Sequence, residues 1–503
     1  MRYLKEALCA SFYYLNKISE GEVMYNELVK NKVTVRKTLT ALTLGLAVMS
    51  GPVIAETNRA VEAWKTFASE QNNADYNKWV ELISDPKAIK LAKEWKDLRG
   101  YDAYDLMDKE TFPEDLKPGL VITGENKADY PWLAKYLTKE LYDAIGGSWG
   151  GIKKMKIVPT NTYYMHNGYL QNTKALKEQN INIKFDEDGQ MVYDDGSYAL
   201  LSGPGASAIP FINPKNGLEL NWNLVANSVG IETLEFSPVY LYSCTAEGEP
   251  DREYKADLWW WHFHNRTEIE PLGDIPGKEE MVEGGAIFFF EPNDVRGLAG
   301  VRQRYASGSK EDDFKVFIPT LRRTRLLTGS DSEDPLASGL ELSWDDWRSY
   351  WVKTDIKKFD YNLIGEEFVL TPVSTVHAYN SMVLTEDKCA IEYMEVELRP
   401  TWKLEIIDKS GKYQYSKRHA WVDKEFYNTR RHITWDPRGN IFKSYDEKRD
   451  WKPSTGEGNW GGIIIRNNVT HRVTTMNMTA TWEDLDVVVD ESMFDVDQLR
   501  DYQ

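Results

Sequence analysis

Two histidines within one aromatic run are the first residues of this chain whose spacing suggests chemistry. The run reads Trp259, Trp260, Trp261, His262, Phe263 and His264. In an extended strand His262 and His264 lie on one face, about 7 Å apart, a spacing at which two imidazoles bind one metal ion. A metal site needs further ligands, and the other histidines show no pairing signature. We therefore expect no metal site and no cofactor.

Adjacent carboxylates suggest glycoside chemistry. They occur as Asp345 with Asp346 and as Glu366 with Glu367. A glycosidase needs two carboxylates that face each other across a sugar, whereas neighbouring carboxylates in an acidic chain are usually solvated. The sequence has no H-E-x-x-H motif, no phosphate-binding loop and no reactive-cysteine motif. We predict a protein that is not an enzyme and assign no catalytic residue, with a glycan-binding or glycan-hydrolysing protein as the alternative, because 18 Trp and 28 Tyr suit sugar stacking.

A cluster of arginines suggests anion binding. Arg322, Arg323 and Arg325 lie within four residues, and guanidinium groups bind phosphate or carboxylate in a bidentate way. They are candidates to hold an anionic head group, and pairing with carboxylates of the chain itself is the alternative. The formal net charge of −18 disfavours nucleic acid as a partner.

The elements that must position these residues are mostly strands. Segments with strand character follow one another from about residue 231 to 480, as in an antiparallel meander. The aromatic run is apolar on both faces, with Trp259, Trp261 and Phe263 on one side and Trp260, His262 and His264 on the other. A strand of this kind is covered on both sides. Periodicity does not tell which face lines a cavity. A second strand, 412–422, is predicted to direct Tyr413, Tyr415, His419 and Trp421 to one face.

Helices are expected before the strands. Asp85 suits an N-cap, Pro86 a first helical turn and Gly100 the end of that helix. A second helix is predicted from Asp129 to Ala144, and a short one over 343–351. The Asp-Gly steps at 188–189 and 195–196 predict hairpin turns, and WDPRGN at 435–440 predicts a type I turn.

The N-terminal region has the pattern of a secretory signal. A basic stretch at 30–37 precedes an apolar stretch at 38–49, which ends in small residues up to Ala55. We expect translation to start at Met24 and cleavage to follow Ala55. The predicted divisions are 1–55 (extension and signal), 56–150 (helical region), 151–490 (β-rich domain) and 491–503 (acidic tail). Whether Cys244 and Cys389 form a disulfide stays open.

Several motifs resemble the superfamily of outer membrane lipoprotein-sorting proteins that includes the carrier LolA and the receptor LolB. They are the turn Asp294 to Gly297, the strand end Ile318 to Arg325 and the stretch Ser338 to Asp346. More narrowly, the chain resembles the family named domain of unknown function 1329 (DUF1329) over about residues 155–480. The motifs that carry this resemblance are 211–223, 319–327, 359–372, 398–405 and 415–446.

The resemblance implies an α+β fold with a large curved antiparallel sheet. This LolA/LolB-like half-barrel would have helices over its concave face and an apolar cavity between them. It also implies a periplasmic location in a Gram-negative bacterium and a carrier for a lipid or another hydrophobic molecule, such as lipoprotein acyl chains. Partners would be an inner-membrane transporter and an outer-membrane acceptor. The candidate cavity wall is Trp259, Trp260, Trp261, His262, Phe263, His264, Tyr413, Tyr415 and Trp421.

Overall fold

A computed structural model describes residues 58–147, 149–227, 232–328, 331–349, 352–375, 379–477 and 491–499. Residues 57–503 form one compact unit. The predicted start at Met24, the signal and its cleavage after Ala55 lie outside the described residues and stay predictions. No helix in the described ranges is long and apolar enough to cross a membrane.

Most of the helical residues precede the long strands. The α-helices are α2 (Arg59–Gln71), α3 (Ala74–Ile83), α4 (Pro86–Arg99), α5 (Ala103–Met107), α6 (Leu133–Tyr136), α7 (Lys139–Ala144), α8 (Asn167–Glu178), α9 (Gly217–Ala226) and α10 (Val496–Leu499). Short 3-10 helices are η1 (Lys127–Asp129), η2 (Pro204–Ser207), η3 (Pro319–Leu321), η4 (Asp331–Glu333), η5 (Trp344–Ser349) and η7 (Glu491–Phe494).

Helix α4 forms as its sequence predicts. The Asp85 side chain accepts a hydrogen bond from the backbone N–H of Lys87 at 2.7 Å, Pro86 occupies the first turn, and Gly100 ends the helix with φ +88°. Only glycine adopts that left-handed conformation without a steric cost. The helix predicted from Asp129 to Ala144 is instead divided into α6 and α7, because the backbone at Leu137 and Thr138 is extended.

The strands form one large sheet and a small hairpin. They are β1 (Val121–Thr123), β2 (Lys154–Ile157), β3 (Lys184–Phe185), β4 (Met191–Val192), β5 (Thr233–Cys244), β6 (Pro250–His262), β7 (Met281–Glu291), β8 (Ala299–Tyr305), β9 (Asp313–Ile318), β10 (Arg323–Leu326), β11 (Phe359–Pro372), β12 (Met382–Leu384), β13 (Ile391–Asp408), β14 (Lys417–Asp423), β15 (Thr429–Trp435), β16 (Ile441–Lys452), β17 (Glu457–Asn467) and β18 (Val473–Asn477).

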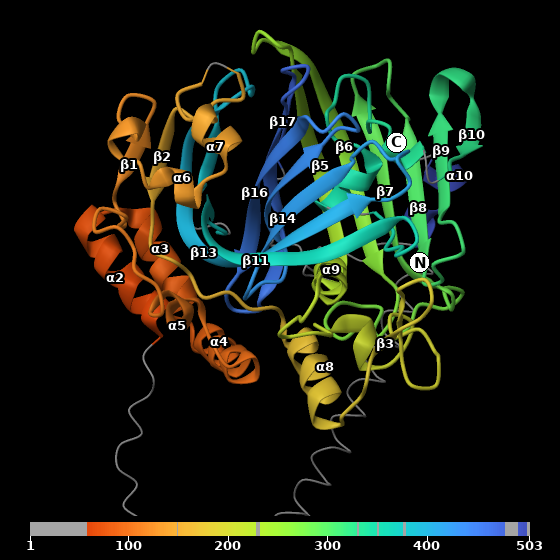
Figure 1. The fold of residues 1–503 in the computed structure, drawn as a ribbon. Helices are drawn as coiled ribbons and strands as arrows, with labels where there is room; N and C mark the ends of the chain where they lie inside the picture. Colours follow the sequence, from red (N-terminus) through yellow and green to blue (C-terminus); the bar gives the residue numbers. More distant parts are fainter. Residues whose placement is uncertain are drawn as a thin grey trace, which may run out of the picture. The chain divides into compact units, whose positions relative to one another are not determined.

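The order in the large sheet is β1-β2-β13-β14-β15-β16-β17-β18-β5-β6-β7-β8-β9-β10, with β11 and β12 paired to β13. All pairs are antiparallel except β2 with β13. Figure 1 shows β11 and β13 sweeping through a wide bend. The predicted α+β class and the curved antiparallel sheet are confirmed. Both hairpin turns around β3 and β4 and the turn between β15 and β16 also form, with Gly189, Gly196 and Gly439 at positive φ.

Cross-strand pairs define one continuous face of strands β14 to β18 and β5 to β9. This inner face carries His432, Ile465, Leu241, Trp260 and Phe314, since residues paired across an antiparallel ladder point to the same side. Their neighbours in each strand point to the opposite, outer face.

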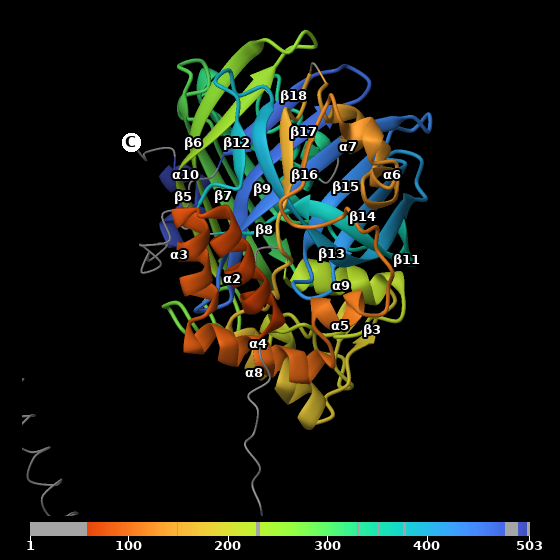
Figure 2. The ribbon, with the colours of Figure 1, turned by 90° about the vertical axis from the view of Figure 1, so that its left-hand side faces the viewer.

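Two kinds of structure cover the inner face. Helices α2, α3, α4, α8 and α9 pack with Leu404, Val422 and Trp451 in one core, and Figures 1 and 2 show α2 to α5 and α8 gathered at one end of the sheet. Over β5 to β9 the cover comes from residues 331–349, where the segment between η4 and η5 supplies Leu336 and Leu342 to that core. The helix predicted over 343–351 is the 3-10 helix η5 in its described part.

The outer face is covered as well. Helices α6 and α7 pack with β2 and the first half of β13 in a core that also holds Ile464 and Val473. Residues 491–499 pack against β6 to β8, with Phe494 and Leu499 buried. The expected acidic tail is therefore a packed segment in its described part, because its few apolar side chains bury against the sheet.

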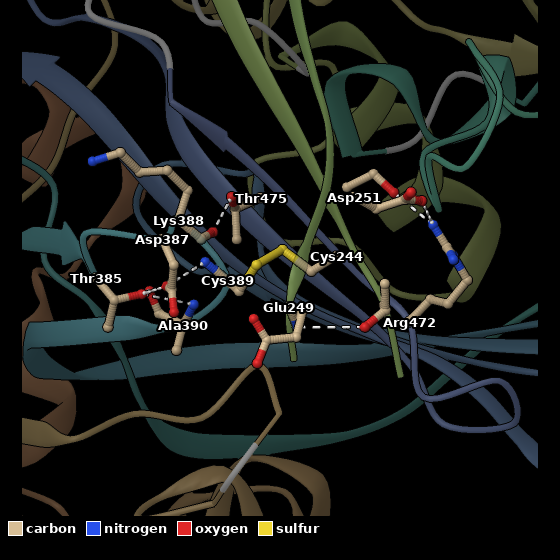
Figure 3. Close-up of a disulfide and its surroundings, with 12 residues drawn as sticks. Cys244, Glu249, Asp251, Thr385, Asp387, Lys388, Cys389, Ala390, Arg472 and Thr475 are labelled. Atoms are coloured by element: carbon tan, nitrogen blue, oxygen red, sulfur yellow. Dashed lines mark hydrogen bonds and ion pairs between the residues drawn. A yellow bond between two sulfur atoms is a disulfide. The ribbon is translucent and has the colours of Figure 1, made fainter. Parts of the chain in front are cut away.

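A disulfide joins two distant parts of the sheet. Cys244 ends β5 and Cys389 precedes β13, and the two residues are 145 positions apart in sequence (Figure 3). Asp387 orders the turn before Cys389 by accepting its backbone N–H at 3.1 Å. The pairing that the sequence left open is thus present, and it fits an oxidising compartment.

Candidate functional site

The aromatic run ends strand β6 and sends three of its side chains to the outer face. Trp259, Trp261 and Phe263 form a core there with the 491–499 segment. The rings of Trp261 and Phe494 stack with centroids 5.5 Å apart. These three side chains are enclosed by the chain's own C-terminal residues.

Trp260 and His262 alternate with these three residues along the strand and therefore point to the inner side, where they border a hollow. The hollow has a volume of about 30 Å³, room for about two water molecules. Its apolar lining comes from the 199–206 region, α9, β7 and the end of β8, and includes Leu200, Trp222, Val225, Val282 and Ala306. The structure thus separates the two faces that periodicity left equivalent. A ligand-binding role for either set stays a prediction.

The imidazole of His262 is neutral at neutral pH. Burial lowers its pKa to about 4, although the nearby Glu283 carboxylate opposes that shift. Its Nε2 atom is buried without a hydrogen-bond partner among the described residues. A neutral ring at the wall of a hollow suits contact with an apolar or uncharged polar group.

His264 does not take part in the hollow. Its Nε2 lies 3.0 Å from the carbonyl oxygen of Lys278 and 2.9 Å from that of Met281, so it fixes the turn before β7. No group of three or more His, Cys, Asp or Glu side chains in the described ranges is arranged to hold a metal ion. The two histidines of the run therefore lie in different environments.

A larger cleft opens beside the hollow. It has a volume of about 430 Å³, within the range of about 300–1,000 Å³ typical of ligand pockets. Its apolar lining consists of Phe314, Leu327, Val352, Phe359 and Tyr413. Lys353 lines both the cleft and the hollow, so the two spaces are neighbours.

Charged side chains stand between the cleft and the hollow. The Asp312 carboxylate lies 2.9 Å from Arg302, 3.1 Å from Arg304 and 3.5 Å from Lys353, and Arg302 also binds Asp345 at 3.1 Å. Burial alone would raise the pKa of Asp312, but the surrounding cations hold that pKa well below its usual range. We call Arg302, Arg304, Asp312, Asp345 and Lys353 the charged partition.

The pKa of Glu333, another acid of the cleft, is shifted in the opposite direction from that of Asp312. Burial raises the pKa of Glu333 to about 7, and the carboxylates of Asp345 and Asp408 add to this shift, although a backbone N–H from Gln414 opposes it. Glu333 is therefore about half protonated at neutral pH. The cleft is correspondingly less negative than its count of carboxylates suggests.

The second predicted strand does not present its aromatic residues on one face. The Tyr413 hydroxyl donates to Asp345 at 2.9 Å in the cleft, and the Tyr415 hydroxyl donates to Asp346 at 2.6 Å on the inner side. Trp421 packs with Ile433 on the outer face. The prediction of one shared face is wrong because β14 begins only at Lys417, so strand alternation does not extend back to the two tyrosines.

The arginine cluster lies away from the hollow. Arg322 occupies the turn between β9 and β10 with φ +49°, and Arg323 and Arg325 belong to the exposed strand β10. Across the residues that the structure describes, none of the three guanidinium groups forms an ion pair with a carboxylate. The structure does not bring them together with Trp260, so a role in holding the cargo head group gains no support.

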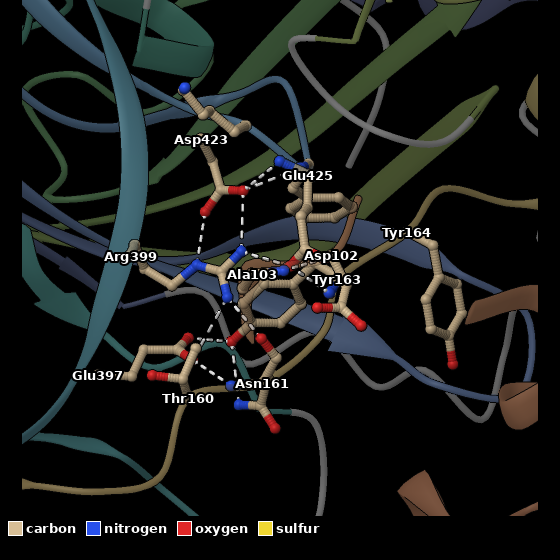
Figure 4. A network of polar contacts seen from close by, with 12 residues as sticks. Asp102, Ala103, Thr160, Asn161, Tyr163, Tyr164, Glu397, Arg399, Asp423 and Glu425 are labelled. Carbon is tan, nitrogen blue, oxygen red and sulfur yellow. Dashed lines mark hydrogen bonds and ion pairs between the residues drawn. The ribbon is translucent and has the colours of Figure 1, made fainter. Parts of the chain in front are cut away.

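Sequence analysis missed a buried network of charges at the junction of the N-terminal helices with the sheet. Arg399 binds both oxygens of Asp423 at 2.8 and 3.0 Å and binds Glu425 at 2.7 Å (Figure 4). Arg430 binds Asp423 at 2.9 Å, and Arg99 of α4 lies 3.3 Å from Glu425. We call these five residues the charged junction; their side chains are fully buried.

The charged junction ties α4 and α5 to the sheet. Glu425 also accepts the backbone N–H of Ala103 at 3.0 Å and that of Tyr163 at 3.1 Å (Figure 4). Every carboxylate oxygen of Asp423 and Glu425 accepts at least one hydrogen bond from a described residue. Four of the five residues fall in the stretches 398–405 and 415–446 that carry the family resemblance. That position is the sequence signal that could have identified them.

One G-x-S-x-G sequence occurs at 146–150, the spacing of a hydrolase nucleophile elbow. That elbow joins a strand to a following helix. Here the sequence follows helix α7 and precedes strand β2, the reverse order, and Ser148 itself lies outside the described residues. The arrangement gives no support to serine hydrolase chemistry.

The solved structures that this chain resembles include three of similar extent. A DUF1329 family protein from Desulfovibrio piger is 18% identical, covers 56% of this chain and 97% of its own, and has a TM-score of 0.40. A domain described as that of an outer membrane lipoprotein-sorting protein, from Vibrio parahaemolyticus, is 17% identical, covers 56% of this chain and 98% of its own, and has a TM-score of 0.38. A LolA superfamily protein from Nitrosomonas europaea is 12% identical, covers 52% of this chain and 91% of its own, and has a TM-score of 0.32.

Comparison with curated proteins gives no match. The family model described as "Protein of unknown function (DUF1329)" matches residues 121–500. This range includes the cleft, the hollow, the disulfide and all of the charged junction except Arg99. The chain belongs to the DUF1329 family.

Proposed function

We propose that the chain is a periplasmic carrier that binds a lipid or another hydrophobic molecule in the cleft beside the hollow. The observation that carries this proposal is the apolar part of the lining of the 430 Å³ cleft, which lies beside charged and polar side chains and consists of Phe314, Leu327, Val352, Phe359 and Tyr413. Each methylene group buried there contributes about 0.8 kcal/mol. Burial alone supplies affinity, and no catalytic group takes part.

The hollow extends this site when the charged partition shifts. In the present structure it is too small for an acyl chain, at about 30 Å³. Lys353 separates it from the cleft, and burial lowers the pKa of Lys353 although Asp312 opposes the shift. Displacement of Lys353 would connect the cleft with the surface of Trp260 and Trp222. In this proposal those rings receive the end of a longer chain.

The finer parts of the proposal concern cellular context. A carrier of this kind receives its cargo from an inner-membrane transporter and delivers it to an outer-membrane acceptor. The disulfide between Cys244 and Cys389 supports an oxidising compartment such as the periplasm. Lipoprotein acyl chains are one cargo that fits the apolar lining.

The first experiment is mass spectrometry of an organic extract of the protein purified without detergent. The expected result is a stoichiometric lipid or other apolar compound. A protein that carries none, and that also fails to bind a fluorescent fatty acid, would contradict the carrier proposal. Binding to a glycan array in that case would favour the sugar-binding alternative, with the aromatic residues as stacking platforms.

A paired substitution locates the site. Leu327→Trp fills the cleft and is expected to weaken fatty acid binding at least tenfold. Leu272→Trp adds the same ring at a site that is 52% exposed and distant in sequence from the cleft lining, so it should leave affinity unchanged. Equal affinities of the two variants would place the ligand elsewhere.

A further inference from the structure

The hairpin of β9 and β10 carries two strongly exposed leucines. Leu326 is 68% exposed and Leu321 is 58% exposed, the two highest values among the large apolar side chains described. Single exposed leucines are ordinary on protein surfaces. Two on one hairpin, separated by four residues, form a local feature.

The same hairpin carries concentrated positive charge. Arg322, Arg323 and Arg325 lie between the two leucines, in a chain whose net charge is −18. All three arginines are exposed, and Arg325 is the last of the groups that lower the pKa of Asp331, after the hydrogen bonds from Thr328. The three charges are therefore directed to solvent.

Strand register places these groups around an edge of the sheet. Arg323 pairs with Ile318 and Arg325 pairs with Val316, so both arginines lie on one side of β10. Thr324 and Leu326 lie on the other side. β10 is the last strand in the order of the sheet, so the hairpin presents cationic and apolar groups together at that edge.

Charged side chains on an edge strand commonly prevent pairing with another chain. That role accounts for arginines but not for Leu321 and Leu326, since exposed leucines at an edge favour association. Guanidinium groups beside exposed apolar side chains match the interface of an anionic bilayer, where phosphates lie next to acyl chains.

We infer that the β9–β10 hairpin docks the protein on an anionic lipid surface. The three arginines bind lipid phosphates, and Leu321 and Leu326 enter the boundary between head groups and acyl chains. Leu327 follows directly on β10 and lines the cleft. Docking would therefore bring that side of the cleft close to the bilayer. The inference does not depend on the proposed cargo, because membrane docking and cargo binding are measured separately.

The test is co-sedimentation of the full chain with vesicles of phosphatidylcholine, with and without about 30% phosphatidylglycerol. Each arginine close to an anionic surface contributes about fivefold to affinity. The variant R322Q/R323Q/R325Q should therefore lose binding to the anionic vesicles on the order of 100-fold. L321S/L326S should also bind more weakly, with its salt dependence retained. Raising the salt concentration should weaken binding of the parent protein.

A matched control removes three exposed cations elsewhere, K87Q/K109Q/R438Q. It changes the net charge equally and should retain vesicle binding. Equal loss in both triple variants would overturn the inference, because only overall charge would then matter. Failure of the parent protein to bind anionic vesicles at low salt would also overturn it.

The edge-guarding role predicts a different outcome. If the arginines only guard the edge, R322Q/R323Q/R325Q self-associates and binds vesicles as well as the parent protein does. Sedimentation velocity without lipid detects that self-association. Because the substituted residues are exposed, thermal unfolding should be unchanged, which separates loss of docking from misfolding.

Discussion

The charged junction and the apolar core under β5 to β9 are buried equally well but are built from different chemistry. Arg399 and Asp423 are fully buried in the junction, and Trp260, Ile287 and Phe314 are buried in the apolar core. The junction fixes the N-terminal helices to the sheet, whereas the apolar core borders the cleft and the hollow. The comparison teaches that anchoring and the proposed cargo binding are assigned to separate parts of one sheet.

The two regions should respond differently to small changes. A buried ion pair contributes little net stability, but removal of one partner leaves an uncompensated charge. An apolar core loses only the contacts of the removed atoms plus any cavity. The junction is therefore expected to tolerate almost no substitution, while the apolar core adjusts. A carrier needs that adjustment at the place where cargo enters.

The largest effect is expected for Asp423→Asn. The change leaves Arg399 and Arg430 buried without their shared carboxylate, and the free energy of unfolding should fall by about 3–5 kcal/mol. Urea unfolding measures it. Asp194→Asn removes an exposed partner of Lys184 and should lower the free energy of unfolding only slightly, because exposed ion pairs contribute little. Similar losses for both variants would remove the distinction between the buried junction and the surface.

The second effect concerns the link between the two regions. The disulfide joins Cys244 at the end of β5, next to the apolar core, to Cys389 just before β13. Strand β13 carries Arg399 of the charged junction. Replacing both cysteines by serine should lower the free energy of unfolding by about 2–5 kcal/mol, since a long loop becomes free in the unfolded chain. Unfolding with and without reductant should show the same difference. An unchanged midpoint in reductant would contradict this expectation.

Sequence patterns predicted the parts of the fold that depend on local residues. The helix from Pro86 to Arg99 followed from Asp85 and Gly100, because capping depends on neighbours in sequence. The covering of the aromatic run on both faces followed from its unbroken apolar character. The choice between Trp259 and Trp260 as hollow-lining residues did not follow, because a period of two describes both faces equally.

The missed features depend on distant parts of the chain. Arg399 and Asp423 are 24 residues apart, and Arg99 is 326 residues from Glu425. No periodicity links such positions, and each charge in isolation resembles a solvated one. The packing of Phe494 on Trp261 was missed for the same reason, since an acidic composition conceals a few apolar anchors. The cleft combines residues from five separated stretches and has no local signature.

A third effect concerns the pH dependence of the hollow. Burial lowers the pKa of His262 to about 4, while the unfolded value is about 6.5. Between these values the unfolded chain binds a proton that the folded chain does not, so stability present above pH 6.5 is lost as the pH falls towards 4. Between pH 7.5 and 4.5 the parent protein should lose roughly 2–3 kcal/mol more than His262→Asn does. Equal losses would show that His262 does not control this pH range.

The smallest effect is expected in the apolar core under β5 to β9. Ile287 lies on the inner face of β7 in the apolar core, and Ile287→Val removes one methylene group. The free energy of unfolding should fall by about 1 kcal/mol, several times less than for Asp423→Asn, although only Ile287→Val reduces the volume of the side chain. Fatty acid affinity should change less than it does in Leu327→Trp, because Ile287 supports the core without lining the cleft. A loss from Ile287→Val as large as that from Asp423→Asn would mean that the apolar core is as rigid as the charged junction. The cleft could then admit cargo only through movement of the charged partition.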